Sequence, residues 1–148
     1  MAAAGGPVSD RLAMIAGMAP VLDPQPYVFC SFAAGAADAA THAAALASFH
    51  EEEGLSLILP QDAARRACAD PGVTMARITL SVHSALEGVG LTAAVATALA
   101  DQGIACNMVA AYHHDHAFVP LGDAARAMAI LKELAKQGAA AQEKGTRS

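Results

Sequence analysis

The stretch that decides the fold runs from Arg77 to Pro120 and reads RITLSVHSALEGVGLTAAVATALADQGIACNMVAAYHHDHAFVP. Apolar residues occupy every second position from Ile78 to Val82, the period of a strand with one buried face. From Leu91 the apolar spacing becomes helical, and Gly103 is placed to end that helix. Alternation returns at Ile104. The stretch therefore predicts strand, glycine-containing loop, helix, strand, tight turn and strand.

Length and composition indicate a globular chain without a nucleic-acid or membrane partner. The 148 residues are 55% hydrophobic and 16% charged, enough for one ordinary core or two small cores that share an interface. The formal charge of −5 and the lack of a dense Lys/Arg patch argue against nucleic acid or an anionic membrane. No apolar run approaches the ~18 residues of a membrane span, and the N-terminus lacks a signal-peptide pattern, so we expect a cytoplasmic protein.

The three cysteines, Cys30, Cys68 and Cys106, lie in predicted strands or a helix and lack CxxC spacing. This pattern is typical of small buried thiols, and it argues against a disulfide framework or a zinc site.

Outside the first stretch, local signals predict further elements. In chain order these are a helix over Asp10–Met18 with Ser9 as its N-cap, a turn over Asp23–Pro26, strands over Tyr27–Phe32 and Leu55–Leu59, and a last helix from Asp123 to about Lys136. The alanine-rich connector Ala33–Phe49 is ambiguous between helix and loop, and His50–Glu53 is typical of a solvated turn.

Two segments of the chain echo each other. Leu57–Arg65 and Phe118–Arg126 each contain the end of a strand, a proline that stops it, and an Asp that opens an alanine-rich helix. Because both fall at the same place in the order of elements, they indicate a duplicated unit.

This order of elements resembles the ACT domain, a βαββαβ ligand-binding module. Glu87–Leu91 and Ala100–Ile104 are similar to the corresponding segments of aspartate kinase regulatory domains. The chain also resembles short bacterial tandem-ACT proteins in five motifs: Tyr27–Cys30, Glu53–Leu55, Thr79–Ser84, Val89–Ala94 and Tyr112–His116. One departure is Ala105, where aspartate kinase domains often carry Asn; Asn107, two residues on, faces the same way.

The resemblance implies an α+β, ferredoxin-like fold of two ACT-like units, with antiparallel sheets and helices on one face. We predict an incomplete N-terminal unit over residues 1–69, a fuller ACT domain over 70–136 and a flexible tail over 137–148.

The loop before the second-half helix is the candidate binding site. Backbone N–H groups at a helix N-terminus can bind a carboxylate, and an amino acid's ammonium group would find acceptors on Ser84, Glu87 or Asn107. Alternatively, Glu87 only faces solvent and the glycines only allow close packing. The resemblance implies a pocket between paired units, bounded by this loop and the second strand of a neighbouring unit. The candidate ligand-binding residues are His83, Ser84, Glu87, Gly88, Val89, Gly90, Leu91, Asn107, Met108 and Val109.

The sequence supports a catalytic or metal site less well than it supports a ligand-binding site. Tyr112–His116 contains three histidines, but successive strand residues point to opposite faces and no further ligand has recognisable spacing. Ser84, His83 and Asp115 supply the residue types of a hydrolytic triad without a nucleophile elbow. We therefore predict no catalytic residue, no metal and no cofactor.

The resulting hypothesis is a non-catalytic regulatory or sensor protein that binds a small molecule, with an amino acid as the first candidate. A structural or interaction module without ligand is the alternative, and a metal-dependent enzyme comes third. Because a half of ~70 residues leaves sheet edges unpaired, we also expect a homodimer through exposed sheet edges or helix faces.

Overall fold

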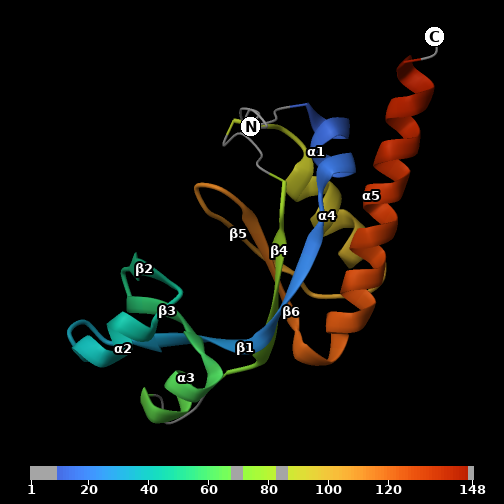
Figure 1. Ribbon diagram of the computed structural model, residues 1–148. Coiled ribbons are helices and arrows are strands. Elements are labelled where there is room, and N and C mark those ends of the chain that lie inside the picture. Colours follow the sequence, from blue (N-terminus) through green and yellow to red (C-terminus); the bar gives the residue numbers. More distant parts are fainter. Residues whose placement is uncertain (1–9, 68–71, 83–86, 147–148) are drawn as a thin grey trace, which may run out of the picture. The chain divides into compact units, whose positions relative to one another are not determined.

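The computed structural model describes residues 10–67, 72–82 and 87–146 and has the predicted α+β architecture. Its elements in chain order are α1 (Arg11–Gly17), β1 (Pro20–Phe32), α2 (Ala39–Ala44), β2 (Ala47–Glu51), β3 (Gly54–Pro60), α3 (Gln61–Ala67), β4 (Thr74–Leu80), α4 (Leu91–Ala100), β5 (Asn107–Ala110), β6 (Asp115–Pro120), the 3-10 helix η1 (Leu121–Asp123) and α5 (Ala124–Thr146) (Figure 1). No helix of these residues is long and apolar enough to cross a bilayer.

The described residues form two compact units. One unit comprises residues 23–77 and is called the inner unit because the other encloses it in the sequence; the outer unit comprises residues 10–22, 78–82 and 87–146. The sheet order is β2-β3-β1-β4-β6-β5, and the unit boundaries fall inside β1 and β4. The inner unit thus has the strand order β2-β3-β1-β4 and the outer unit the order β1-β4-β6-β5. Two strands therefore contribute to both units.

Along the chain, the elements of the inner unit follow the order βαββαβ, as β1-α2-β2-β3-α3-β4. The strand that completes the N-terminal half, β4, thus lies beyond residue 69 in the sequence. The predicted boundary between Ala69 and Asp70 lies outside the described residues and stays a prediction.

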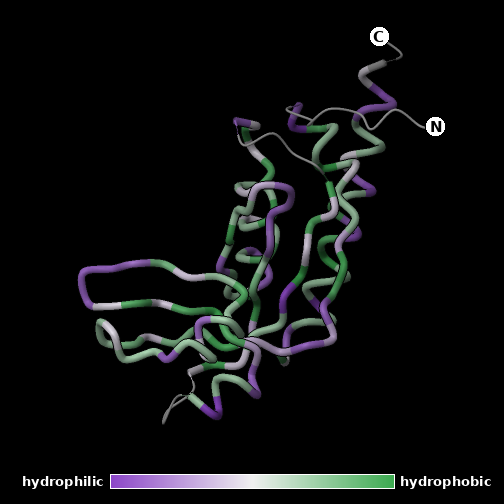
Figure 2. Tube along the Cα trace, turned by 60° about the vertical axis from the view of Figure 1, so that its left-hand side comes forward, coloured by the Kyte–Doolittle hydropathy of each residue, from purple (hydrophilic) through white to green (hydrophobic). Residues whose placement is uncertain are grey.

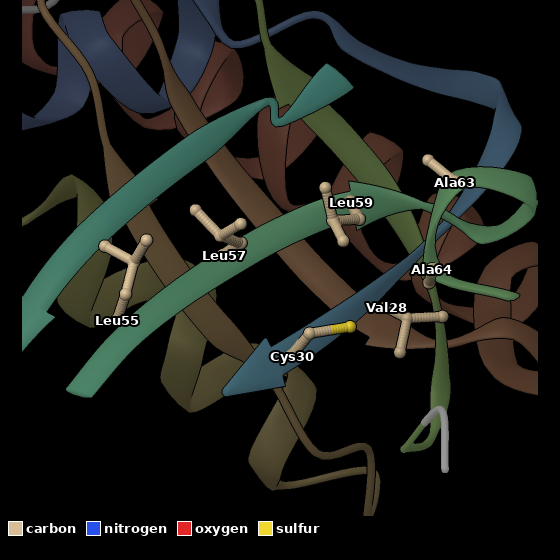
Figure 3. Packing of buried hydrophobic residues seen from close by; sticks show 7 residues of the cluster. All are labelled: Val28, Cys30, Leu55, Leu57, Leu59, Ala63 and Ala64. Atoms are coloured by element: carbon tan, nitrogen blue, oxygen red, sulfur yellow. The ribbon is translucent and has the colours of Figure 1, made fainter. Parts of the chain in front are cut away.

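The core of the inner unit lies on one face of two antiparallel strands. Val28 pairs with Leu59 and Cys30 with Leu57, so these four side chains share a face. Figure 3 shows them with Leu55 of β3 and two alanines of α3, Ala63 and Ala64; all seven side chains are buried. The predicted strands over Tyr27–Phe32 and Leu55–Leu59 are therefore confirmed. The ambiguous connector forms α2 and most of β2, and the expected turn over His50–Glu53 is shortened because His50 and Glu51 belong to β2.

The outer unit confirms the interpretation of the Arg77–Pro120 stretch. Ile78, Leu80 and Val82 are buried, and α4 begins at Leu91. Gly103 has φ +70°, and the next amide, Ile104 N, donates to Leu99 O at 3.0 Å. This is the glycine-terminated helix end that the sequence predicts.

The first helix differs from the prediction in its cap. The side chain of Asp10 accepts a hydrogen bond from Ala13 N at 2.8 Å and caps α1, which spans Arg11–Gly17. The prediction that Ser9 caps this helix is wrong, because Asp10 already occupies the N-cap position.

The predicted turn over Asp23–Pro26 is also wrong, because these residues lie inside β1. Pairing with β3 begins only at Tyr27, so Pro24 and Pro26, which lack an N–H group, precede that ladder. Asp23 holds the segment in place: it accepts from Gln25 N at 2.8 Å, from Tyr27 Oη at 2.9 Å and from Arg77 Nε at 3.1 Å. Arg77 Nη2 donates to the same carboxylate, and the guanidinium lies 5.2 Å from the centre of the Tyr27 ring.

The predicted tail from Gln137 is helical instead. Helix α5 continues to Thr146, and at Gly138 it packs closely on α1. A Cβ atom on Gly138 would lie 2.7 Å from Ile15 Cγ2 and 3.0 Å from Ala16 N. Contact with α1 and the high helix propensity of the alanines after Gly138 explain why the helix continues.

The two echoing segments keep matching contacts. Asp62 and Arg65 of α3 approach to 3.8 Å, and Asp123 and Arg126 at the start of α5 approach to 2.8 Å. Arg126 also donates to Gln102 O at 3.0 Å, which joins α5 to the end of α4. The echo therefore extends from sequence to side-chain pairing.

The Asp23 cluster generates a prediction on stability. Burial acts to raise the pKa of Asp23, but the hydrogen bonds from Gln25, Tyr27 and Arg77 and the charge of Arg77 outweigh it, so the net pKa is lowered. Replacing Arg77 by Leu leaves the carboxylate largely buried without its cation, and we expect the free energy of unfolding at pH 7 to fall by about 2 kcal/mol. Because the folded-state pKa is lowered, the stabilisation exists above the unfolded pKa and disappears as pH falls through the folded pKa.

Urea unfolding at pH 7 and at pH 3 measures both effects. The control is Arg65→Leu, whose pair with Asp62 has side chains 63% and 78% exposed; it should cost less than about 0.5 kcal/mol. Equal losses in the two variants at pH 7 would contradict a structural role for the Asp23 cluster.

The packing of α5 on α1 generates a second prediction. Gly138→Ala should lower the free energy of unfolding by about 1 to 3 kcal/mol, because the new methyl group meets the backbone of α1 and the helices must separate. Gly145→Ala is the matched control in the same helix, with nothing within 4 Å of the added atom. It should be neutral or stabilise by about 0.5 kcal/mol through helix propensity. Thermal unfolding of both variants decides, and a stabilised Gly138→Ala variant would refute the close approach.

Candidate functional site

The start of α4 is built around a glycine in a left-handed conformation. Gly90 is the N-cap residue with φ +107°, and no side chain caps the helix there. The first intrahelical bond runs from Ala94 N to Gly90 O at 3.0 Å. The earlier amides of the first turn have no such partner within the helix, and the helix dipole adds positive potential at this end. The geometry suits a negatively charged group.

Arg11 lies directly at this helix start. A Cβ atom on Gly90 would be 2.8 Å from Arg11 Cδ and 3.2 Å from Arg11 Nε. The position of α1, with Met14 and Ile15 in the core, therefore brings the Arg11 side chain to Gly90, the N-cap residue of α4. Among the ion pairs of the described residues, none involves Arg11.

Sequence interpretation missed Arg11 because 79 positions separate it from Gly90. Its only local signal is that it is the one cation of the first helix. A periodicity argument places Arg11 on the exposed side of α1 and says nothing of which element lies beside it.

The predicted loop residues have different environments. Glu87 is exposed, Val89 is 79% exposed, and Gly88 and Gly90 are half-buried. Leu91 is buried, so its side chain anchors α4 to the core and only its backbone faces the loop. His83 and Ser84 lie outside the described residues.

The predicted strand residues lie on β5. Asn107 is exposed, Met108 and Val109 are half-buried, and they pair with Phe118, Ala117 and His116 of β6, respectively. In the outer unit β6 separates β5 from β4, so β5 lies two strand spacings, about 10 Å, from the strand that leads into the loop. The sheet therefore does not place β5 next to β4 within one unit.

The histidine hairpin is held by hydrogen bonds. His116 Nδ1 lies 3.0 Å from Thr79 Oγ1, and His114 Nδ1 lies 3.4 Å from the carbonyl oxygen of Val82. Burial raises the pKa of Asp115, and the charges of His116 and His114 oppose that shift. In residues 10–67, 72–82 and 87–146, no group of three or more His, Cys, Asp or Glu side chains is arranged to hold a metal ion.

The contact of His114 with Val82 also places the hairpin tip at the strand end that leads into the candidate loop. Tyr112 at this tip is 74% exposed. The end of the outer unit thus combines a cationic helix start with exposed apolar side chains on two loops.

The cysteines fit a structural role. Cys30 is buried in the inner core, and Cys106 is half-buried with a pKa raised by burial. Its Sγ atom lies 3.5 Å from the Sδ atom of Met108. A raised pKa keeps the thiol protonated at neutral pH, which argues against a nucleophile. Cys68 lies outside the described residues.

Comparison with protein families and solved structures agrees with the order of elements in the fold. Two ACT domain models match the chain in tandem, over residues 10–73 and 76–133. No curated protein sequence matches the chain.

A Vibrio cholerae protein of unknown function, described as a possible transport protein, is 39% identical, with a TM-score of 0.73 and coverage of 84% of this chain and 94% of that one. The ligand-free regulatory subunit of aspartate kinase from Thermus thermophilus has a TM-score of 0.58 at 11% identity and covers 80% of this chain and 97% of its own. Aspartokinase III from E. coli, in complex with aspartate and ADP, has a TM-score of 0.56 at 14% identity, covering 78% of this chain and 33% of its own. The last two likenesses show the fold.

Together the two family models cover most of the strands and helices. They confirm the resemblance to the ACT domain that the loop and helix motifs indicate. The chain belongs to the ACT domain family and carries two ACT domains in tandem, a regulatory ligand-binding architecture.

Proposed function

We propose that this protein is a non-catalytic sensor that binds an amino acid or a closely related carboxylate at the start of α4. The observation that carries the proposal is the approach of Arg11 to the uncapped, glycine-led start of α4. Backbone amides and a guanidinium group both bind carboxylates, and hydrogen bonds to charged groups contribute about 1.5 to 3 kcal/mol each.

The ammonium group of an amino acid needs acceptors near that carboxylate. Glu87 is exposed and lies three residues before Gly90. Asn107 and the edge backbone of β5 offer others, and we propose that they act on a ligand held by a different ACT unit, as the family resemblance implies. The aspartate in the E. coli aspartokinase structure supports amino acids as the first class to test.

The alternative is an interaction module that binds no small molecule. It is favoured by the exposure of Val89 and Tyr112, which are 79% and 74% exposed on the loops around the candidate site. Large apolar side chains in such positions also serve protein contacts. Under either function we propose a cytoplasmic protein that acts as a homodimer.

A thermal-shift screen of the protein amino acids, with nucleotides as a second set, tests the proposal. A ligand at about 100 times its Kd adds ~2.7 kcal/mol to the free energy of unfolding and raises the melting temperature by several degrees. Arg11→Gln should weaken the binding of that ligand about tenfold or more, since it removes the cation and keeps a polar side chain of similar length. Isothermal titration measures the affinity.

Arg65→Gln is the matched control, because Arg65 is an exposed arginine of the inner unit with only a 3.8 Å contact to Asp62. It should leave the affinity unchanged. If no amino acid or nucleotide shifts the melting temperature, the interaction module is the better account. A ligand that binds Arg11→Gln and the wild type equally would move the site away from α4.

A further inference from the structure

Within the outer unit, α4 and α5 border an open groove of ≈ 450 Å³. Its apolar lining includes three half-buried residues, Ala98 of α4 and Ile130 and Leu134 of α5, and the exposed Ala129. Figure 2 shows the pattern behind this lining, since hydrophobic and hydrophilic residues alternate along α5. From Ala129 to Gln137, the first and last α5 residues of the groove, the helix rises by about 12 Å. The groove therefore holds an apolar strip about two helical turns long.

Each of the two helices adds a carboxylate to the groove. Asp101 is the C-cap residue of α4, Glu133 lies on α5, and both side chains are exposed. Because α4 ends here, its last carbonyl groups add the negative end of the helix dipole. Of the described residues that line the groove, none is Lys or Arg. The groove is therefore apolar along its length and acidic on both of its helices.

The cations of α5 do not neutralise the groove. Among the ion pairs of residues 10–67, 72–82 and 87–146, none involves either of its carboxylates. Lys132 and Lys136 lie about 100° or more around α5 from the middle of its lining residues. Arg126 pairs with Asp123 at 2.8 Å, and its Nη2 donates to Gln102 O at 3.0 Å. This last contact shows that the end of α4 accepts a guanidinium group.

We propose that the groove between α4 and α5 is the docking site for a basic amphipathic helix of a partner protein. A third helix can pack its side chains into the groove between two others, with apolar anchors at positions i, i+3 or i+4 and i+7. These anchors would contact Ile130 and Leu134, and the small side chains of Ala98 and Ala129 leave room for large ones. Lys or Arg beside the anchors would then bind the carboxylates on either side, through charge-assisted hydrogen bonds.

Charge complementarity is the argument for this occupant. The formal charge of −5 attracts a basic partner at long range, and the two carboxylates disfavour an acidic segment, an anionic small molecule or a nucleic acid in the groove. An apolar strip of this length fits a small, transient interface rather than a permanent one. Because the ten residues of α4 separate the groove from the ligand site at Gly90, the proposal does not depend on that site.

Fluorescence anisotropy with three labelled peptides tests the chemistry of the partner. The first probe is a helical peptide of about 15 residues made of Leu, Ala and Lys, with its leucines on one face. The second has the same composition in shuffled order, and the third has Glu in place of every Lys. The first should bind the full chain at least about tenfold more tightly than the second, and the third should not bind.

Paired variants test the place of binding. Asp101→Asn combined with Glu133→Gln should weaken the binding of the first peptide about tenfold or more. Glu52→Gln combined with Glu53→Gln is the matched control, because it makes the same change of charge at two exposed residues of the β2–β3 turn. It should leave the dissociation constant within about twofold of wild type.

A second pair tests the apolar strip. Ala129→Lys places a long cationic side chain in the groove and should also weaken binding about tenfold, whereas Ala139→Lys, at an exposed α5 position outside the groove, should have little effect. Melting temperatures check that each variant is folded. Equal binding of the first two peptides, or equal effects within either pair of variants, overturns the proposal. It is also overturned if the wild type associates with itself in sedimentation velocity and Ala129→Lys abolishes this, since a second copy then fills the groove.

Discussion

Two strands that each serve two units are the constraint on which the structure depends. An ACT unit needs four strands, and the 148-residue chain supplies six in the described residues, so β1 and β4 are divided between the units. The division falls after Leu22 and after Arg77. The carboxylate of Asp23 binds the guanidinium of Arg77 next to both crossings, which fixes β1 and β4 to each other at the place where prolines weaken the backbone ladder.

The candidate site follows from a second constraint, the close approach of α1 to the start of α4. Gly90 is in a conformation that residues with a side chain rarely adopt, and its missing Cβ leaves room for Arg11. A side chain at position 90 would displace the guanidinium group from the helix start. Gly90 thus allows the left-handed turn before α4 and also leaves room for the positively charged Arg11 side chain.

Small residues shape the outer surface of the helices as well as their packing inside. Gly138 lets α5 contact α1, and this contact carries the helix into a projecting end rich in alanine.

The sequence by itself determined the features that depend on neighbouring residues. Alternation fixed the buried face of Ile78 to Val82, the helix period fixed the start of α4, and Gly103 fixed its end, because each signal is contained in a few consecutive residues. Only the tertiary structure decided that Asp23–Pro26 is strand and that residues after Gln137 are helix. In the first case the deciding partner, Arg77, is 54 positions away, and in the second it is the backbone of α1. Arg11 at Gly90 belongs to the same class, since no local pattern shows which distant side chain the fold brings to a helix end.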